Sequence, residues 1–287
     1  MSSVLTSPGP LLDRDDGRDT WRRQEGVVKF LEFPVRKEGM SHREFHLYWQ
    51  RHHSPHVMNV TGFSRYIRKY VSAHAYDGHV QGLPLRFRQE TPFDGASELW
   101  INGLDEIASW LSHPQYEELI RPDELRFLSQ EGKGRVLIAR EERVLDLPLD
   151  DPESGLVRLY LQLESRSGVA RDAFHSACSD FAMVLANSPS TLHLRQVILN
   201  HMVDGPLPLE LPAPGVDVVM ALGFDTLQQA KKILALQEIE KRWDSLEGLV
   251  TDIGNIPALV TRLCVVHDEF TFQPTTMQAR PFSWDSI

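Results

Sequence analysis

The sequence is poor in cysteine and contains no long apolar run. Its two cysteines, Cys178 and Cys264, exclude a disulfide framework and a cysteine-rich zinc site. No apolar stretch approaches the length of a membrane-spanning helix. The first residues carry Asp13, Asp15 and Asp16 instead of the apolar core of a signal peptide. These absences predict a cytoplasmic protein with no membrane partner.

An excess of basic residues is absent as well. The 287 residues include 30 Lys and Arg against 40 Asp and Glu, which gives a net charge of −10. A negatively charged chain lacks the attraction to phosphates that nucleic acids and anionic membranes require, so we expect neither as a partner. With 41% hydrophobic and 24% charged residues, the composition is typical of a globular protein of two ordinary domains.

The chain contains one sequence pattern twice. Three pairs of segments match at nearly constant offsets of 129, 129 and 127 residues, which predicts a tandem duplication. Residues that build the scaffold should recur in both copies, whereas polar residues kept in only one copy are candidates for chemistry. The matching pairs are Gly26–Lys29 with Gly155–Arg158, Phe45-His46 with Phe174-His175, and His74–Gly78 with His201–Gly205.

Both copies predict the element order β-α-β-β-α-β. Ser41 and Glu44 form a capping box that starts the first helix, and Pro55 should end that helix near Ser54. In copy one we expect strands over 27–35, 65–75, 95–101 and 135–144, helices over 41–54 and 104–119, and a short helical piece after Pro122. In copy two we expect strands over 156–163, 192–202, 216–224 and 259–270, and helices over 170–186 and 227–240.

This element order is the ferredoxin-like split βαβ pattern. Each unit is an α+β layer pair, an antiparallel sheet with helices on one face and a bare second face. Two copies in one chain can cover both bare faces by packing sheet against sheet. The predicted boundaries are a mobile arm over 1–24, a first domain over 25–147, a second domain over 153–272, and a tail over 273–287.

The first copy carries a series of landmarks in a fixed order. They are Tyr48-Trp49-x-x-x-His53-Ser54-Pro55, Tyr70, His74-x-x-Asp77-Gly78, Glu98-Leu99-Trp100 and Asp123-Glu124-x-Arg126-Phe127. With these landmarks the first copy, over roughly residues 26–146, resembles the EthD family of the dimeric α+β-barrel superfamily. The resemblance implies an α+β barrel made of two ferredoxin-like halves, here fused as a pseudo-dimer, and leaves a further homodimer open. Relatives include polyketide cyclases, decarboxylases, dehydratases, isomerases, cofactor-free monooxygenases and haem enzymes, so the fold does not fix the reaction.

His53 is the first candidate for chemistry. An imidazole gives or takes a proton near neutral pH, although a histidine at a helix end can simply interact with the last carbonyls. The offset of 129 residues places Ala182 at the corresponding position of copy two. A structural requirement common to both copies would have kept a polar group there, which favours a functional role for His53.

Glu98 is the second candidate, because it lies in a largely apolar strand. A buried carboxylate requires a partner or a proton, and copy two has Ala221 at this position. Two interpretations remain open at this point. Glu98 forms a salt bridge with Lys29 or Arg68 on a neighbouring strand, or it orients a catalytic histidine.

Two further residues are weaker candidates for a role in chemistry. His74 resembles a family position near the pocket, but its counterpart His201 is kept in copy two, so a structural hydrogen bond explains it equally well. Tyr70 corresponds to Val197. It is either a donor to a substrate oxygen or an ordinary core tyrosine of a strand.

A metal or haem site is a minor alternative. His42 and His46 are one helical turn apart and His53 lies two turns further on the same side, but the acidic or thiolate companions of zinc helices are missing. A haem needs an axial ligand in a large apolar pocket, and the sequence has no motif for one. We therefore expect no cofactor and no metal.

The leading hypothesis is a cofactor-independent acid/base enzyme of the lyase type, acting by dehydration, decarboxylation or aldol-type chemistry on a small apolar, aromatic or polyketide-like substrate. His53 would transfer the proton, Glu98 or His74 would orient it, and Tyr70 would donate to a developing enolate oxygen. The alternatives are a cofactor-free or haem-assisted monooxygenase and a non-catalytic small-molecule carrier. We expect the pocket in copy one, between its sheet and helix 41–54, with His53 and Glu98 on its wall.

Overall fold

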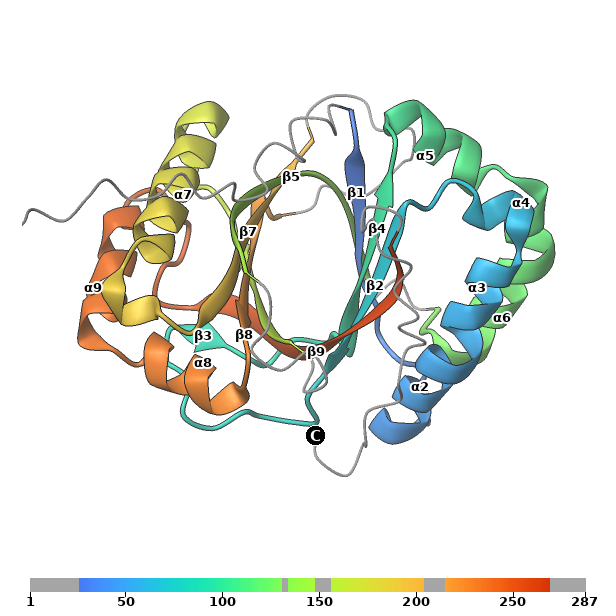
Figure 1. The fold of residues 1–287 in the computed structure, drawn as a ribbon, viewed down its shortest axis with the longest axis horizontal. Coiled ribbons are helices and arrows are strands. Elements are labelled where there is room, and N and C mark those ends of the chain that lie inside the picture. The colour runs from blue at the N-terminus through green and yellow to red at the C-terminus, as the bar shows by residue number, and fades with distance from the viewer. Residues whose placement is uncertain (1–25, 131–133, 148–155, 204–214, 269–287) are drawn as a thin grey trace, which may run out of the picture.

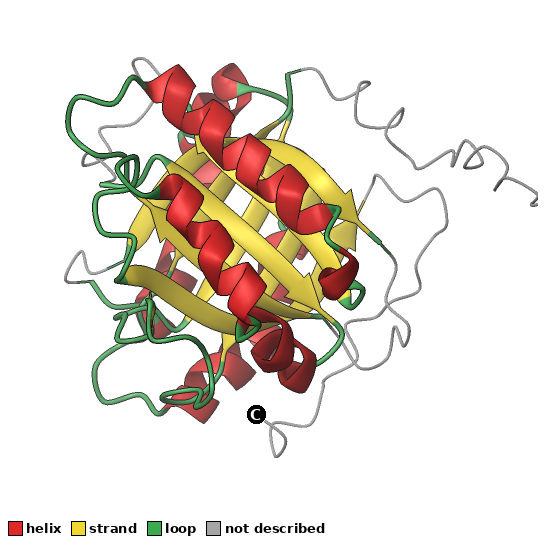
Figure 2. Ribbon diagram, turned by 90° about the vertical axis from the view of Figure 1, so that its left-hand side faces the viewer, coloured by secondary structure: helices red, strands yellow, loops and turns green. Residues whose placement is uncertain are grey.

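Eight antiparallel strands close into a barrel that has helices on two opposite sides (Figures 1 and 2). The structure is a computed structural model that describes residues 26–130, 134–147, 156–203 and 215–268. The predicted arm over 1–24, the linker before the second copy, and the tail over 273–287 lie outside the described residues. The domain boundaries therefore stay predictions. In the described part of the chain, no helix combines the length and the apolar character needed to cross a bilayer.

Each half contributes four neighbouring strands to the barrel. The first half provides the order β2-β4-β1-β5 and the second half β7-β8-β6-β9, and the halves join through the pairs β5–β7 and β9–β2. The strands are β1 (Val28–Phe33), β2 (Lys69–Ala75), β4 (Gly95–Ile101), β5 (Arg135–Asp146), β6 (Val157–Leu163), β7 (Leu194–Met202), β8 (Val218–Phe224) and β9 (Ile256–Asp268), and a short strand β3 (Phe87–Arg88) runs parallel to β9.

This arrangement confirms the predicted α+β pseudo-dimer and the burial of the two bare sheet faces within one chain. The faces meet as the inner wall of a closed barrel, because the edge strands of each half hydrogen-bond to the other half. Closure leaves no strand edge of the barrel unpaired, which removes a common cause of aggregation. Side chains alternate along each strand, so Leu31 and Phe33 pack inside the barrel while Val28 and Phe30 pack under the helices.

The helices cover the outside of each half. Those of the first half are α2 (His42–Tyr48), the π-helix η2 (Trp49–His53), α3 (Ser54–Asn59), α4 (Thr61–Ser64), α5 (Leu104–Leu111), the π-helix η3 (Tyr116–Ile120) and α6 (Arg121–Phe127). Those of the second half are α7 (Arg171–Ala186), α8 (Leu227–Leu234) and α9 (Gln237–Trp243), with the short 3-10 turns η4 (Pro189–Thr191) and η5 (Asp244–Leu246).

The prediction that Pro55 ends the first helix is wrong. The π-helix lies just before this proline, and the backbone N–H of Ser54 bonds to the carbonyl of Trp49, five residues back. This wider turn changes the hydrogen-bond pattern where Pro55 has no N–H to offer, so the chain continues as α3. The capping box of Ser41 and Glu44 at the helix start is confirmed.

The predicted helix over 104–119 is interrupted. It ends at Leu111, and a separate π-helix begins at Tyr116. Pro114 lies between the two, and a proline disfavours helical geometry at the residue before it. Residues of both pieces, among them Trp110 and Tyr116, line a cavity over the sheet of the first half.

Candidate functional site

A cavity of about 320 Å³ lies between the sheet of the first half and its helices. This is the region in which the sequence predicts the pocket, and the volume is at the lower end of the range for small-molecule sites. Three strands form its floor through Phe30, Glu32, Ser97, Leu99 and Val136. The helical residues on its walls include His53, Val57, Phe63, Trp110, Tyr116, Ile120, Arg121 and Glu124.

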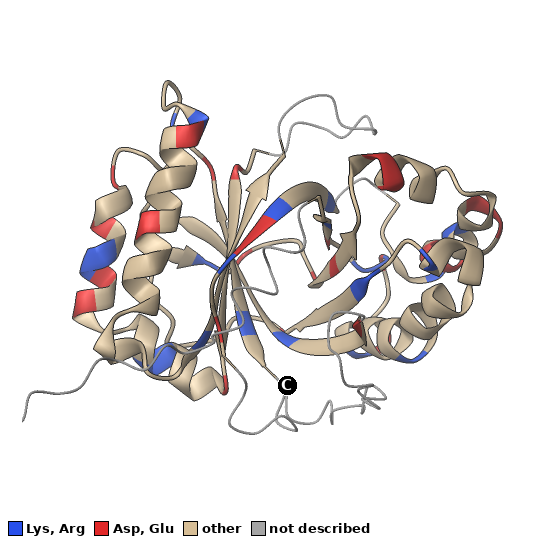
Figure 3. Ribbon diagram, turned by 45° about the horizontal axis from the view of Figure 1, so that its top comes forward, with Lys and Arg blue, Asp and Glu red and all other residues tan. Residues whose placement is uncertain are grey.

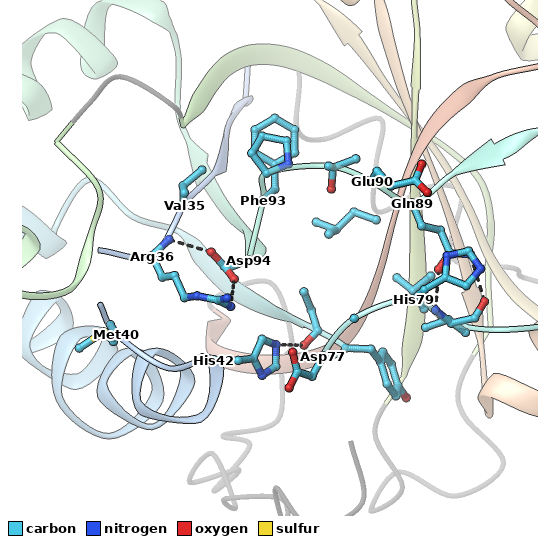
Figure 4. A pocket seen from close by; sticks show the side chains of 18 of the residues that line it. Val35, Arg36, Met40, His42, Asp77, His79, Gln89, Glu90, Phe93 and Asp94 are labelled. Carbon is cyan, nitrogen blue, oxygen red and sulfur yellow. Dashed lines mark hydrogen bonds and ion pairs between the residues drawn. The ribbon is translucent and has the colours of Figure 1, made fainter. Parts of the chain in front are cut away.

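A larger and more open hollow of about 730 Å³ lies at one end of the barrel (Figure 4). Its wall carries mixed charges, among them Arg36 paired with Asp94 at 2.6 Å, and His42 beside Asp77. None of the predicted site residues His53, Tyr70, His74 and Glu98 lines it. We therefore place the candidate site in the smaller cavity, where His53 is exposed to a ligand.

His53 forms a dyad with Asp123. The Nδ1 atom of His53 lies 2.9 Å from Oδ2 of Asp123, and both side chains are largely buried. The histidine lines the cavity while the carboxylate does not. With Nδ1 held by the carboxylate, Nε2 is the ring nitrogen left to face a ligand. A carboxylate in this position fixes the tautomer and the orientation of the imidazole and stabilises its protonated form.

Asp123 is itself held as a carboxylate. Burial works against its charge, but hydrogen bonds from His53 and Tyr48 outweigh burial and lower its pKa. The Tyr48 hydroxyl donates to Oδ1 at 2.5 Å, and Arg126 lies 3.8 Å away on the solvent side. The partner of His53 is thus Asp123. The sequence suggested Glu98 or His74 for this role, but neither of them takes it.

Two carboxyl groups, Glu32 and Glu124, face the same cavity. Burial and the neighbouring Glu124 raise the pKa of Glu32 to about 8. Burial also raises the pKa of Glu124, although that carboxyl accepts hydrogen bonds from Tyr116 at 3.0 Å and from Arg121 at 3.2 Å. The cavity therefore combines an oriented histidine with a carboxyl group that holds a proton at neutral pH. The combination of an oriented base and a protonated carboxyl group is typical of acid/base sites.

Aromatic rings form another part of the cavity wall. Phe63 stacks on Trp110 with ring centroids 4.9 Å apart and on Tyr116 at 5.7 Å, and Phe30 meets Trp110 edge to face at 5.2 Å. Flat aromatic walls favour a flat aromatic ligand through stacking and apolar burial. The wall of the cavity thus combines aromatic rings with polar groups.

Glu98 is not on the wall of this cavity, so that part of the prediction is wrong. Along β4 the side chains alternate, and Ser97 and Leu99 face the cavity while Glu98 points into the barrel. There it bonds to Lys29 at 2.6 Å and receives hydrogen bonds from Arg158 and Tyr160 of the second half. The salt bridge to Lys29, one of the two interpretations left open, is the one observed.

Tyr70 and His74 also lie away from the cavity. The buried hydroxyl of Tyr70 accepts a hydrogen bond from Trp49 at 2.9 Å and lies 3.1 Å from Ser54 Oγ, and burial raises its pKa to about 12. His74 is fully buried in a hydrogen-bonded chain in which His42, His46 and His74 follow one another at 2.9 Å, and burial lowers its pKa to about 3. This geometry gives both residues structural contacts.

The zinc alternative is also wrong for the described residues, where no group of three or more ligand side chains could hold a metal. His42 and His46 remain adjacent, but the π-helix adds an extra residue to the turn before His53. This rotates His53 off their shared face and toward Asp123. A haem does not fit the cavity either, because the space of about 320 Å³ is small for a macrocycle and contains two carboxyl groups.

The second half fills the equivalent space with apolar side chains. The position that matches His53 is Ala182, which is fully buried and packs in one cluster with Phe181 and Trp243. The rings of these two residues lie 4.4 Å apart. The position that matches Glu32 is Leu161, which is also fully buried in this cluster. Both polar groups therefore belong to the first half alone.

Three residues of the site, Asp123, Glu32 and Glu124, were not predicted from the sequence. Asp123 and Glu124 stand in one of the family landmarks, so the signal for them was present. Glu32 is a charged residue within the apolar run of β1, as Glu98 is in β4. The same reasoning that selected Glu98 applies to Glu32.

Comparison with known proteins supports the observed fold and the family resemblance of the first half. Residues 37–131 match the model of the EthD domain, and no curated protein matches the sequence. Similar solved structures include an anthrone oxidase-like protein, with a TM-score of 0.54, 10% identity, and coverage of 86% of this chain and 96% of that chain. A candidate monooxygenase from Lactobacillus acidophilus NCFM has a TM-score of 0.50, 8% identity, and coverage of 85% and 96%. Another from Fusobacterium nucleatum subsp. nucleatum has a TM-score of 0.51, 7% identity, and coverage of 83% and 91%. At these identities the likeness shows the fold alone.

Proposed function

We propose that this chain, whose residues 37–131 match the model of the EthD domain, is a cofactor-independent oxygenase of a small aromatic substrate with an acidic C–H group. The observation that carries this proposal is the His53–Asp123 dyad on the wall of an aromatic-lined cavity. The dyad supplies a base, and the stacked rings of Phe63 and Trp110 supply a surface for a flat substrate.

The chemistry begins with proton transfer. Nε2 of His53 takes a proton from a CH₂ group of the substrate, and the electron pair of that C–H bond stays on the substrate as a delocalised carbanion. The carbanion then reduces dioxygen. Conversion of the CH₂ group to a carbonyl releases four electrons. One oxygen atom of O₂ enters the product and the other leaves as water, so atoms and electrons balance without a further reductant.

The same first step would serve the lyase-type reaction that the sequence favoured. We place the oxygenase first because proteins named as an anthrone oxidase-like protein and as candidate monooxygenases share the barrel over nearly their full lengths. A cavity lined by both aromatic rings and proton-transfer groups suits either reaction. Dependence on dioxygen separates them.

The test uses the full chain and anthrone, a tricyclic aryl ketone whose CH₂ group is acidic. We expect uptake of one O₂ per molecule oxidised, and one ¹⁸O atom from ¹⁸O₂ in the product. Turnover should stop under argon. Product that forms equally well without oxygen, with loss of water or CO₂ from a polyketide-like substrate, would support the lyase. Tight binding of aromatic compounds without turnover would support the carrier instead.

A further inference from the structure

Glu32 is a carboxyl group without a partner. It lies in β1 between Ser97 of β4 and Val136 of β5, and all three residues line the cavity. Its chain neighbours Leu31 and Phe33 point into the barrel. Among the described residues, Glu32 makes no hydrogen bond and no ion pair. An acidic side chain held in an apolar strand without a partner serves no purpose in packing, because burial of a carboxylate is costly.

The charged groups around Glu32 are already engaged. Arg121 of α6 is the cation that faces it, and its guanidinium bonds to Glu124 at 3.2 Å and to Gln130 at 2.9 Å. Tyr116 of η3 donates its hydroxyl to Glu124. His53 of η2 is bound to Asp123, and the buried Tyr70 of β2 is neutral. Among the described residues, Arg121 compensates a Glu32 carboxylate only in part, because burial and the repulsion from Glu124 outweigh its attraction.

We propose that Glu32 is a second catalytic residue, a neutral carboxylic acid that donates a hydrogen bond to the carbonyl oxygen of the substrate. This inference rests on the proposed function, because it assigns the partner of the His53 base. It also narrows the substrate class to enolisable aryl ketones. A carboxylate ligand would put a negative charge beside Glu124, whereas a ketone oxygen offers the acceptor that an O–H group of Glu32 requires.

The step that Glu32 assists is enolisation. His53 removes the proton from the carbon atom, and the C–H electron pair forms a new C=C bond. The π electrons of the carbonyl move to its oxygen, which accepts a hydrogen bond from the O–H group of Glu32. The products are an enolate, which is the delocalised carbanion of the proposed reaction, and an imidazolium on His53, while Glu32 keeps its proton. No electron is gained or lost in this step, and His53 returns to its first state when it releases the proton.

The burial that raises the pKa of Glu32 to about 8 gives a direct experiment that needs no turnover. Infrared difference spectra of the full chain, wild type minus Glu32→Gln, should contain the carbonyl stretch of a protonated carboxylic acid at pH 7. That band should disappear as the pH rises through about 8. If the Glu32-dependent band is already lost at pH 6, the residue is an ordinary carboxylate and the proposal is overturned.

A binding experiment tests the substrate class. Anthrone and anthracene-9-carboxylate are titrated under argon against wild type, Glu32→Gln and Glu32→Leu, the last of which installs the side chain that the second half has at Leu161. We expect wild type to prefer the ketone, Glu32→Gln to keep its affinity because an amide also donates, and Glu32→Leu to lose about tenfold, the effect of one hydrogen bond. Unchanged ketone affinity in a folded Glu32→Leu overturns the proposal. If that variant does not fold, the pH dependence of ketone binding is measured instead. Wild type should lose affinity for the ketone above pH 8, whereas Glu32→Gln should not. Binding that is independent of pH in both proteins overturns the proposal.

The two proposals fail separately. If Glu32 is protonated at pH 7 and selects ketones but no dioxygen is consumed, the assignment of Glu32 stands and the oxygenase reaction is wrong. If dioxygen uptake with anthrone is the same in wild type and Glu32→Leu, the oxygenase stands and the role of Glu32 is wrong.

Discussion

The two halves of this protein have the same backbone plan and use the space between sheet and helices in opposite ways. In the first half, that space is a cavity with His53 and Glu32 on its wall. In the second half, Phe174, Phe181 and Trp243 lie fully or almost fully buried in one apolar cluster. The same architecture therefore builds either a site or a solid core, and the difference lies in side-chain volume and polarity at a few positions.

Features common to both halves show which polar groups belong to the scaffold. His46 and His74 of the first half contact each other with ring centroids 5.0 Å apart, and His175 and His201 repeat this contact at 4.6 Å. The second half has no dyad like that of His53, yet it keeps this histidine pair. The pair therefore serves the packing of the first helix on the second strand in each half. This recurrence supports a structural role for His74.

Charged side chains inside the barrel connect the two halves. Figure 3 shows acidic and basic positions on the strands of the barrel as well as on the helices. Lys29, Glu98 and Glu141 come from the first half, and Arg158 and Tyr160 from the second. Lys29 and Glu98 have no exposed side-chain surface. Buried charges of this kind depend on one another, because the loss of one partner leaves the others uncompensated.

The largest expected effect comes from breaking this junction. Lys29→Met removes the ammonium but keeps the length of the side chain, and it should lower the free energy of unfolding by about 3–5 kcal/mol, the usual cost of removing one partner from a buried ion pair. Chemical denaturation at pH 7 measures it, with the exposed Lys232→Met on α8 as the matched control. Equal stability of both variants would show that the junction contributes nothing.

The same variant has a predicted pH dependence. Burial alone would raise the pKa of Glu98, but Lys29 and Arg158 outweigh it and lower the pKa to about 2. A depressed folded-state pKa stabilises the protein above the ordinary value of 4.5, and this contribution is lost as the pH falls toward 2. The stability difference between wild type and Lys29→Met should therefore shrink between pH 4.5 and 2, and a constant difference would contradict the assignment.

The second effect is on activity. His53→Ala gives the first half the side chain that the second half has at Ala182, and it should reduce turnover roughly a hundredfold or more, the usual scale for a general base. The melting temperature should change little, because the lost hydrogen bond to Asp123 contributes only about 1 kcal/mol. The exposed His193→Ala in the second half should leave turnover unchanged. Full activity of His53→Ala would remove the base from the proposed mechanism, and unfolding would show that the histidine is structural.

The smallest effect concerns orientation of the base. Asp123→Asn keeps the shape of the side chain, but its amide can present a donor to Nδ1 of His53 and favour the wrong tautomer. We expect a loss of at least about tenfold in kcat with KM unchanged, since Asp123 does not line the cavity. The exposed Asp105→Asn on α5 is the control. A rise in KM at constant kcat would show that Asp123 shapes the cavity and does not position His53.

Much of the fold follows from local sequence. Alternating apolar strands, the capping box at Ser41 and the repeat at a constant offset predict two ferredoxin-like halves, and β4 (Gly95–Ile101) has the predicted bounds. His53 is also found from sequence, because a proton-carrying residue stands out where the second copy has alanine. These features depend on neighbours in the chain, which the sequence contains directly.

Which face of a strand meets the helices was decided only by tertiary structure. Every residue of β4 is buried, because the inside of the barrel is as well shielded from solvent as the layer under the helices. The sequence therefore selected Glu98, which lies in the barrel, and passed over Glu32, which lies in the cavity. Asp123 reaches His53 across 70 residues of sequence, and Arg158 reaches Glu98 from the other half. The sequence by itself determined the elements and their repeat, whereas the pairing of charges required the closed barrel, because such contacts depend on which strands and helices become neighbours in space.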